Sequence, residues 1–307
     1  MFIAQAFRYN QSFWKYLIIP ILFFGLMALN YVAIEMLGLD MNQIMQEEIA
    51  RKGSNRVLFE NLLAFLIFLA GLFLWVKYVH KQPIKSLTTS RKKVDWSRFW
   101  FAFILVAVFN IGVTLLDYYS NPQDYVLNFQ WEPFLYLLLI SVFLIPIQTS
   151  FEEYFFRGYL MQGIGLVAKN RWIPLVLTSV IFGGLHYFNP EVTKLGDIIM
   201  IYYIGTGFML GIMTLMDEGL ELALGFHAAN NLITALLVTA DWTAFQTNSV
   251  FKDVSEPSAG FDIIIPVLVV YPIFLFILAK KYNWTNWKEK LFGRVETSEL
   301  LNVSEEN

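Results

Sequence analysis

The chain has 307 residues, of which 57% are hydrophobic and only 15% are charged. Soluble domains have about 45–50% apolar and about 25% charged residues, so this composition excludes an ordinary soluble protein and predicts an all-α polytopic membrane protein. The net charge of −3 and the lack of a basic block argue against nucleic acid as a partner, and the absence of cysteine excludes disulfides, thiolate metal sites and a cysteine nucleophile.

Eight apolar segments are long enough to count as spans, since one crossing of a bilayer takes about 20 residues. They cover residues 14–37, 58–79, 98–118, 131–167, 172–188, 197–216, 220–240 and 261–281. The first follows Arg8 and Lys15, as the core of a signal peptide would. It exceeds the usual core of roughly 7–15 residues and no small-residue cleavage site follows, so we expect a retained span. The fourth is too long for one perpendicular crossing, and the fifth ends at Asn189 and Pro190, a helix stop.

Lys and Arg are distributed unevenly among the loops, and in membrane proteins the cytoplasmic loops carry the excess. The second connection, the fourth connection and the tail are rich in them, with Lys77, Lys81, Lys85, Arg91, Lys92, Lys93, Arg98, Lys169, Arg171, Lys280, Lys281, Lys288, Lys290 and Arg294. The third loop has none and the seventh has only Lys252. Although Arg51, Lys52 and Arg56 in the first loop speak against it, the larger asymmetry predicts a cell-membrane protein with both termini in the cytoplasm.

We divide the chain into three parts. Residues 1–128 hold helices 1–3 and their loops, residues 129–242 form a core of helices 4–7, and residues 243–307 hold a loop, helix 8 and a cytoplasmic tail. Outside the core, His80 lies close to lysines in the sequence, and we expect it to be a solvated residue at the inner edge of the second span.

The core contains three charged residues within its longest apolar run: Glu152, Glu153 and Arg157. Placing such charged groups inside a bilayer costs several kcal/mol unless they are paired or hydrated. Glu153 and Arg157 are four residues apart, which is the favourable order and spacing for an ion pair on one helix face. Glu152 points about 100° away from Glu153. These geometries fit either a catalytic carboxylate with a supporting ion pair or a buried ion pair that only holds the bundle together.

Two histidines within apolar segments add to this set. His186 follows Phe182 by four residues, and His227 precedes Asn231 by four, so each pair lies on one face of its helix. Two intramembrane histidines, an asparagine and a diglutamate together predict a shared polar site, in an interior cavity open to the cytoplasm.

A glutamate, two histidines and an asparagine around a water suit the hydrolysis of an amide bond. Carboxylate and imidazole groups deprotonate water, and imidazole and amide groups donate hydrogen bonds to an oxyanion. The sequence contains no HExxH, no GxSxG and no cysteine, which excludes the peptidase classes that depend on them. We expect no cofactor, but Glu152, His186 and His227 are acceptable zinc ligands, so a zinc site stays open as an alternative.

Three motifs carry a resemblance to a known family. EEYFFRG, FGGLH and HAANN are similar to the EExxxR, FxxxH and HxxxN motifs of the CAAX prenyl protease type II and bacteriocin-processing family, called CPBP or Abi. The motifs occur in order on three separate predicted spans, and the resemblance covers about residues 130–240. It implies an α-helical protein with a cavity within the membrane, and an intramembrane endopeptidase that acts on a membrane-associated or lipidated peptide.

The resemblance also implies a role for each matching residue. Glu152 would be the catalytic glutamate, His186 would help to activate the water, and His227 and Asn231 would form the oxyanion site. The supporting residues would be Glu153, Arg157 and Phe182.

Two other classes of function compete with the peptidase. One is a non-catalytic immunity or partner-binding protein on the same scaffold, because many bacterial relatives are linked to bacteriocin self-immunity. The other is a transporter with a buried carboxylate, although no pair of broken helices in matching halves is evident.

Overall fold

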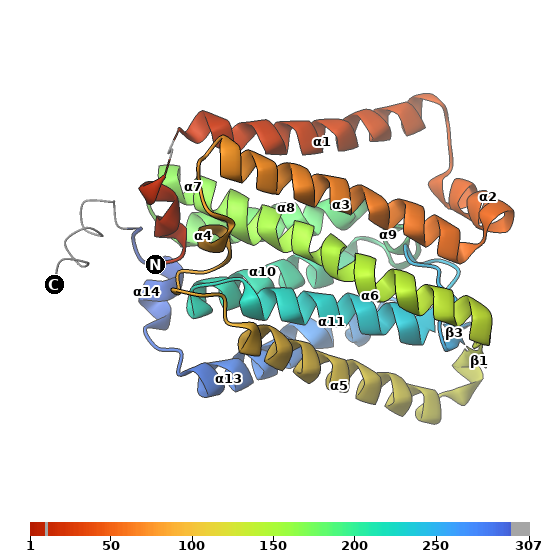
Figure 1. Ribbon diagram of the computed structural model, residues 1–307. Coiled ribbons are helices and arrows are strands. Elements are labelled where there is room, and N and C mark those ends of the chain that lie inside the picture. Colours follow the sequence, from red (N-terminus) through yellow and green to blue (C-terminus); the bar gives the residue numbers. More distant parts are fainter. Residues whose placement is uncertain (10–11, 296–307) are drawn as a thin grey trace.

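The structure is a computed structural model that describes residues 1–9 and 12–295, so the expected tail beyond residue 295 lies outside the described residues. In the described part, long helices form a bundle and three short strands lie at one end (Figure 1). The long helices are α1 (Phe13–Met36), α3 (Ser54–Tyr78), α5 (Trp96–Ser120), α6 (Trp131–Glu153), α8 (Trp172–Leu185), α10 (Met200–Asp217), α11 (Glu221–Leu237) and α13 (Tyr271–Tyr282). The shorter ones are α2 (Met41–Lys52), α4 (Ile84–Thr88), α7 (Met161–Ala168), α9 (Pro190–Leu195), α12 (Phe261–Ile265) and α14 (Trp287–Phe292).

Among residues 1–9 and 12–295, six helical segments are long and apolar enough to cross a membrane. They are Phe13–Met36, Ser54–Tyr78, Trp96–Ser120, Trp131–Ala168, Asp197–Asp217 and Ile263–Tyr282. The predicted all-α polytopic fold is therefore confirmed, but the count of eight spans is not. The expected fifth span, Trp172–Phe188, is apolar but shorter than the others. The expected seventh, α11, has 17 residues and is mostly buried inside the bundle.

The over-long fourth span is one continuous helical segment. A π-helical stretch, η3 (Tyr154–Leu160), follows α6 immediately after Glu153 and leads into α7. Single π-helical turns within α-helices are frequent at functional sites. The segment ends at Lys169, which adopts a left-handed conformation with φ of 52°.

The two ends of the bundle differ in charge. We call one the basic end, with η1 (Ile3–Arg8), α4, α14 and the α7–α8 turn, and the other the sheet end, with α2, α9 and the strands (Figure 1). The strands β1 (Tyr125–Leu127), β3 (Phe251–Asp253) and β2 (Val238–Thr239) form a sheet in the order β1-β3-β2. Val126 pairs with Lys252 antiparallel, and Thr239 pairs with Lys252 in parallel.

Side chains close the basic end. Phe2, Ile3 and Leu87 are buried, and Gln162 Nε2 donates to the carbonyl oxygens of Phe2 and Ser86, at 3.3 and 3.0 Å. Ion pairs link the α3–α5 connection to the α10–α11 turn. Arg91 binds Asp217 at 2.8 Å and Glu221 at 3.1 Å, and Arg98 also pairs with Asp217.

His80 is part of this closed end, and the expectation of a solvated side chain is wrong. Its ring is only 1% exposed. It packs on Tyr16 with ring centroids 4.2 Å apart, and its Nε2 lies 3.1 Å from the hydroxyl of Tyr159. Its lysine neighbours in the sequence suggested exposure, but the chain after α3 turns back onto the bundle and buries this ring.

Candidate active site

A buried ion pair lies at the centre of the site. Arg157 Nη1 donates to Glu153 Oε1 at 2.9 Å, and both side chains are fully buried. Arg157 Nη2 donates to the carbonyl oxygen of Gly207 at 3.2 Å, and the guanidinium lies 4.1 Å from the centre of the Phe182 ring. The i,i+4 spacing thus places the two charges in contact, and Phe182 covers the arginine.

His227, on α11, joins the two glutamates. Its Nδ1 lies 2.8 Å from Glu153 Oε1, and its Nε2 lies 3.6 Å from Glu152 Oε2. Because the oxygen of an ionised carboxylate only accepts hydrogen bonds, the Nδ1 of His227 carries a proton and donates it to Glu153. The ring is therefore fixed by Glu153, and its other nitrogen faces Glu152.

Glu152 is the exposed member of the pair of glutamates. Its side chain is 13% exposed, whereas that of Glu153 is fully buried. Gln148, one helical turn earlier on α6, donates from Nε2 to Glu152 Oε1 and accepts at Oε1 from Asn231 Nδ2, at 3.3 Å. Sequence reasoning missed Gln148, although it is polar and stands four residues before Glu152 in an apolar run.

His186 lies at the end of α8, where the helix gives way to the short 3₁₀ turn η4 (His186–Phe188). Its Nδ1 is 2.8 Å from the carbonyl oxygen of Phe182. A carbonyl oxygen only accepts, so Nδ1 carries the hydrogen and, in the neutral ring, Nε2 keeps its lone pair. The ring stacks on Tyr203 of α10 with centroids 4.4 Å apart. Tyr203 is a second residue that sequence reasoning missed.

Close packing of α8 against α10 holds His186 and Tyr203 together. A Cβ on Gly183 would lie 2.7 Å from the backbone nitrogen of Ile204, and a Cβ on Gly207 would lie 2.6 Å from the carbonyl oxygen of Ser179. Only glycine permits this approach at either position.

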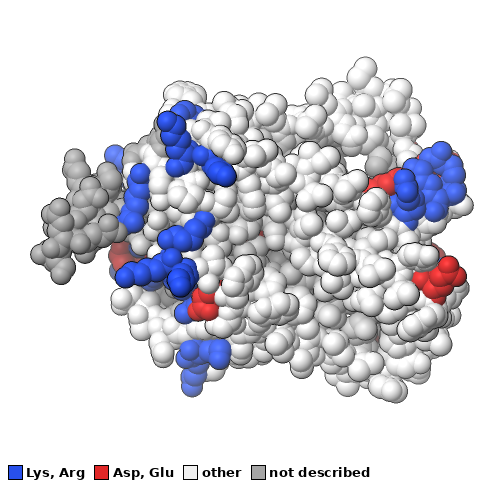
Figure 2. Space-filling view, in the orientation of Figure 1, with Lys and Arg blue, Asp and Glu red and all other residues white. Residues whose placement is uncertain are grey.

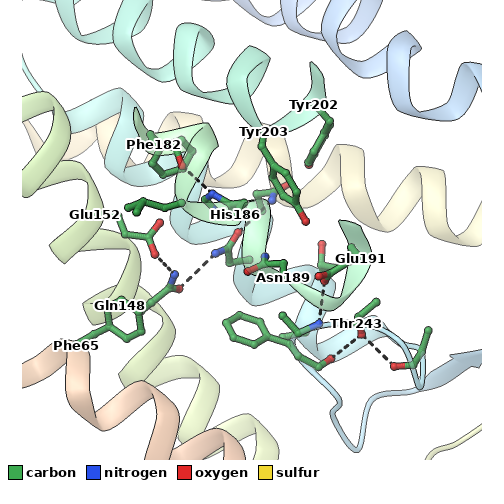
Figure 3. Close-up of a pocket in the computed structure, with 18 of the residues that line it drawn as sticks. Phe65, Gln148, Glu152, Phe182, His186, Asn189, Glu191, Tyr202, Tyr203 and Thr243 are labelled. Atoms are coloured by element: carbon green, nitrogen blue, oxygen red, sulfur yellow. Dashed lines mark hydrogen bonds between the residues drawn. The ribbon is translucent and has the colours of Figure 1, made fainter. Parts of the chain in front are cut away.

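A cavity of about 540 Å³ lies against these residues. Glu152, His186, Asn231 and Gln148 line it, together with aromatic and apolar side chains (Figure 3). His227 does not belong to its wall and is only 5% exposed. Three of the four residues expected at the catalytic site thus meet at one cavity, and the fourth lies behind Glu152.

The cavity extends away from the basic end. Further lining residues lie at the sheet end, in or next to α9, in β2 and the loop after it, and in β3: Asn189, Glu191, Val238, Thr239, Ala240, Trp242, Thr243, Ala244, Phe245 and Asp253. The expected opening to the cytoplasm depends on the orientation of the bundle in the membrane and stays a prediction, but the cavity extends toward the sheet end rather than toward the basic loops. The reason is that η1, α4 and the aromatic residues of η3 fill the bundle on the basic side of Glu152.

Comparison with known proteins places these motifs in a family. The family model of the Rce1-like, type II CAAX prenyl endopeptidases matches residues 130–233. The uncharacterized protein YyaK of Bacillus subtilis (strain 168) is 32% identical over 241 residues, which are 75% of this chain and 79% of YyaK. The chain belongs to the CPBP family, which includes the type II CAAX prenyl proteases. No solved structure gives a significant match.

Glu152, His186 and His227 are the ligands that the zinc alternative would use in this CPBP protein. Among the described residues, no group of three or more His, Asp or Glu side chains is placed to hold a metal ion. His227 directs Nδ1 to Glu153 and His186 directs Nδ1 to a backbone carbonyl, so Nε2 is the remaining acceptor nitrogen of each neutral ring.

Proposed function

We propose that this CPBP protein is an intramembrane endopeptidase that hydrolyses a peptide bond of a membrane-associated or lipidated peptide with a glutamate-activated water. One observation carries the proposal: Glu152, His186 and Asn231 share the wall of one cavity in a bundle of apolar helices. The membership of a protease-type family supports it.

Glu152 would be the general base. Its Oε2 is buried 3.6 Å from His227 Nε2 without a hydrogen-bond partner among the described residues, and its Oε1 accepts from Gln148. A water between the Glu152 carboxylate and the Nε2 of His186 would give one proton to the carboxylate while its oxygen attacks the carbonyl carbon. When the C–N bond breaks, Glu152 returns the proton to the leaving nitrogen, so the carboxylate is regenerated. Such acid–base catalysis contributes about 10²- to 10⁴-fold.

Asn231 would stabilise the oxyanion. One of its Nδ2 hydrogens goes to Gln148, which leaves the second free to donate into the cavity. The loss of one such donor costs about 10²- to 10³-fold in kcat. We assign His227 a positioning role, because its ring contacts Glu152 and Glu153 and lies outside the cavity wall. We further propose that the reaction needs no metal ion, which the arrangement of these ligands supports.

The orientation in the membrane follows from charge. We propose that the basic end lies in the cytoplasm, together with both termini. Of the Lys and Arg residues, only Arg51, Lys52, Arg56, Lys194 and Lys252 lie at the sheet end, and Arg157 lies within the bundle. Figure 2 displays the gathering of blue side chains at the basic end, and one cluster near α2 at the other. That cluster pairs with Glu48 and Glu60.

The test compares the protein termini that proteolysis creates in cells that produce either the wild-type protein or the Glu152→Gln variant. We expect termini that depend on wild-type protein and vanish with Glu152→Gln and with His186→Ala. Glu132→Gln is the matched control, since Glu132 is an exposed carboxylate in the first turn of the same helix. Termini that persist in Glu152→Gln, or an absence of any difference, would contradict the peptidase and favour the non-catalytic partner-binding function.

A further inference from the structure

The cavity has a deep end and a mouth. Glu152 and Phe182 lie at the deep end, and Glu191 and Thr243 lie on the far side, near the sheet end (Figure 3). Thr234, on α11, is an exposed lining residue about one helical turn beyond Asn231. A molecule that reaches Glu152 through this cavity therefore passes α9 and the loop after β2.

In the part of the chain that the structure describes, packed side chains fill the bundle between Glu152 and the basic end. Beyond Glu152, the residues Phe155, Phe156 and Tyr159 are each at most 1% exposed. Leu87 of α4 contacts this segment, since its Cγ lies 3.1 Å from where a Cβ on Gly158 would be. The Arg91 and Arg98 ion pairs then cover the α10–α11 turn. Access from the basic end would require these packed elements to move apart.

The charged groups on the cavity wall are all acidic. Glu152, Glu191 and Asp253 line it, and none of the lining residues is Lys or Arg. Glu191 Oε1 accepts from the backbone N–H of Ala244 at 2.8 Å, which holds the side chain at the mouth. Its Oε2 is buried without a hydrogen-bond partner among the described residues.

The basic residues of the sheet end do not neutralise this wall. Lys252 pairs with Asp241 at 2.8 Å, and neither it nor Lys194 of α9 lines the cavity. Such a negative cleft with low-dielectric walls raises the local concentration of cations about 10- to 10³-fold. The remaining wall is largely aromatic and aliphatic, which suits apolar side chains.

We propose that the cavity receives its substrate from the sheet end, outside the cytoplasm, and that it favours a peptide segment with both positively charged and apolar side chains. That the bound segment is a substrate rests on the proposed peptidase function. The access route and the charge preference do not, and both are measurable without turnover.

The access route is tested with single cysteines, because the natural chain contains none. Thr234→Cys reports the cavity, Gln123→Cys reports the sheet end and Lys92→Cys reports the basic end, and all three positions are exposed. Val108→Cys, which is 65% exposed on the apolar surface of α5, is the control for a lipid-facing thiol. Intact cells that produce each variant are treated with a membrane-impermeant, charged methanethiosulfonate reagent.

We expect Thr234→Cys and Gln123→Cys to react in intact cells and Lys92→Cys to react only after the cells are permeabilised. If Thr234→Cys reacts only after permeabilisation, as Lys92→Cys does, the proposed route is overturned. It is also overturned if Thr234→Cys reacts neither before nor after permeabilisation. If the route is confirmed while no cleavage depends on Glu152, the peptidase proposal fails and the access proposal stands.

The charge preference is tested with a cationic and an anionic reagent of the same type. We expect the ratio of cationic to anionic labelling rates to be at least about tenfold higher at Thr234→Cys than at Gln123→Cys. Adding Glu191→Gln should lower that ratio, whereas Glu256→Gln should not, since Glu256 lies at the same end but does not line the cavity. Equal ratios at the two cysteines would overturn the preference for positive charge.

Discussion

The Nδ1 atom of His227 lies 2.8 Å from Oε1 of Glu153, the same oxygen that accepts from Arg157. One carboxylate thus holds both the arginine of the first motif and the histidine of the third. Since Glu153 and Arg157 are fully buried, the loss of either leaves an uncompensated charge inside the bundle.

This arrangement predicts that Glu153→Leu is strongly destabilising. Removal of one partner of a buried ion pair costs about 3–5 kcal/mol, because the other charge stays buried alone. The double variant Glu153→Leu/Arg157→Leu should recover part of that loss. Thermal unfolding of the detergent-solubilised protein measures both. A double variant that is less stable than the single one would contradict this account of the pair.

Substitution of Gln148 should cause a catalytic defect rather than a loss of stability. It positions Glu152 and Asn231 by one hydrogen bond to each, so Gln148→Leu should lower kcat about 10²-fold with little change in KM. The unfolding temperature should change less than with Glu153→Leu, since Gln148 is buried but lines a cavity and carries no charge. The assay uses whichever substrate the comparison of termini identifies. An unchanged kcat would show that Gln148 does not position the catalytic groups.

The two glycines of FGGLH should differ in their tolerance of a methyl group. Gly183→Ala pushes α8 off α10 and should cost about 1–3 kcal/mol, as overpacking does. Gly184→Ala is the matched control, because nothing lies within 4 Å of its Cβ position. This control should be neutral or slightly stabilising. Unfolding temperatures of the two variants compare them directly, and equal losses would contradict the close approach at Gly183.

Glu218, at the basic end, predicts a pH dependence of stability. Burial by itself raises the pKa of Glu218, but the ammonium of Lys290, whose Nζ lies 2.6 Å from Oε1, the N-terminal ammonium and Arg171 together outweigh it and hold the pKa below its ordinary value of 4.5. A lowered pKa in the folded state stabilises the fold above pH 4.5, and this stabilisation is lost as the pH falls through the folded-state pKa. Glu218→Gln should therefore be less stable than the wild type at pH 7, by about 1.5–3 kcal/mol.

Below pH 4.5 the two proteins should converge in unfolding temperature. Glu289→Gln removes an exposed carboxylate from α14 and should show no such pH-dependent difference. A constant difference across the whole pH range would mean that the ionised state of Glu218 is not what stabilises this end.

Metal removal is the last test. Because Glu152, His186 and His227 are not arranged as zinc ligands, cleavage should continue at an unchanged rate after prolonged treatment with a strong chelator. Loss of activity that returns on addition of zinc would restore the metal alternative.

The sequence by itself determined the class of fold and the motif residues that meet at or behind the cavity wall. Hydropathy over about 20 residues reports burial in a bilayer, and the i,i+4 spacing reports one helix face, so both are readable locally. The pairing of Glu153 with Arg157 and the family motifs are of this kind. Only the tertiary structure decided that His80 is buried, that Gln148 connects Glu152 with Asn231, and that His227 lies behind the cavity wall.

The direction of the cavity is the clearest example of a feature that only the tertiary structure decided. It depends on η1 and α4 packing under one end of η3 while α9 and the strands leave the other end open. These contacts join segments far apart in the sequence, and no local period or charge count encodes them. The close approach of α8 and α10 at Gly183 and Gly207 is equally non-local, because a glycine in an apolar run does not reveal which helix it will meet.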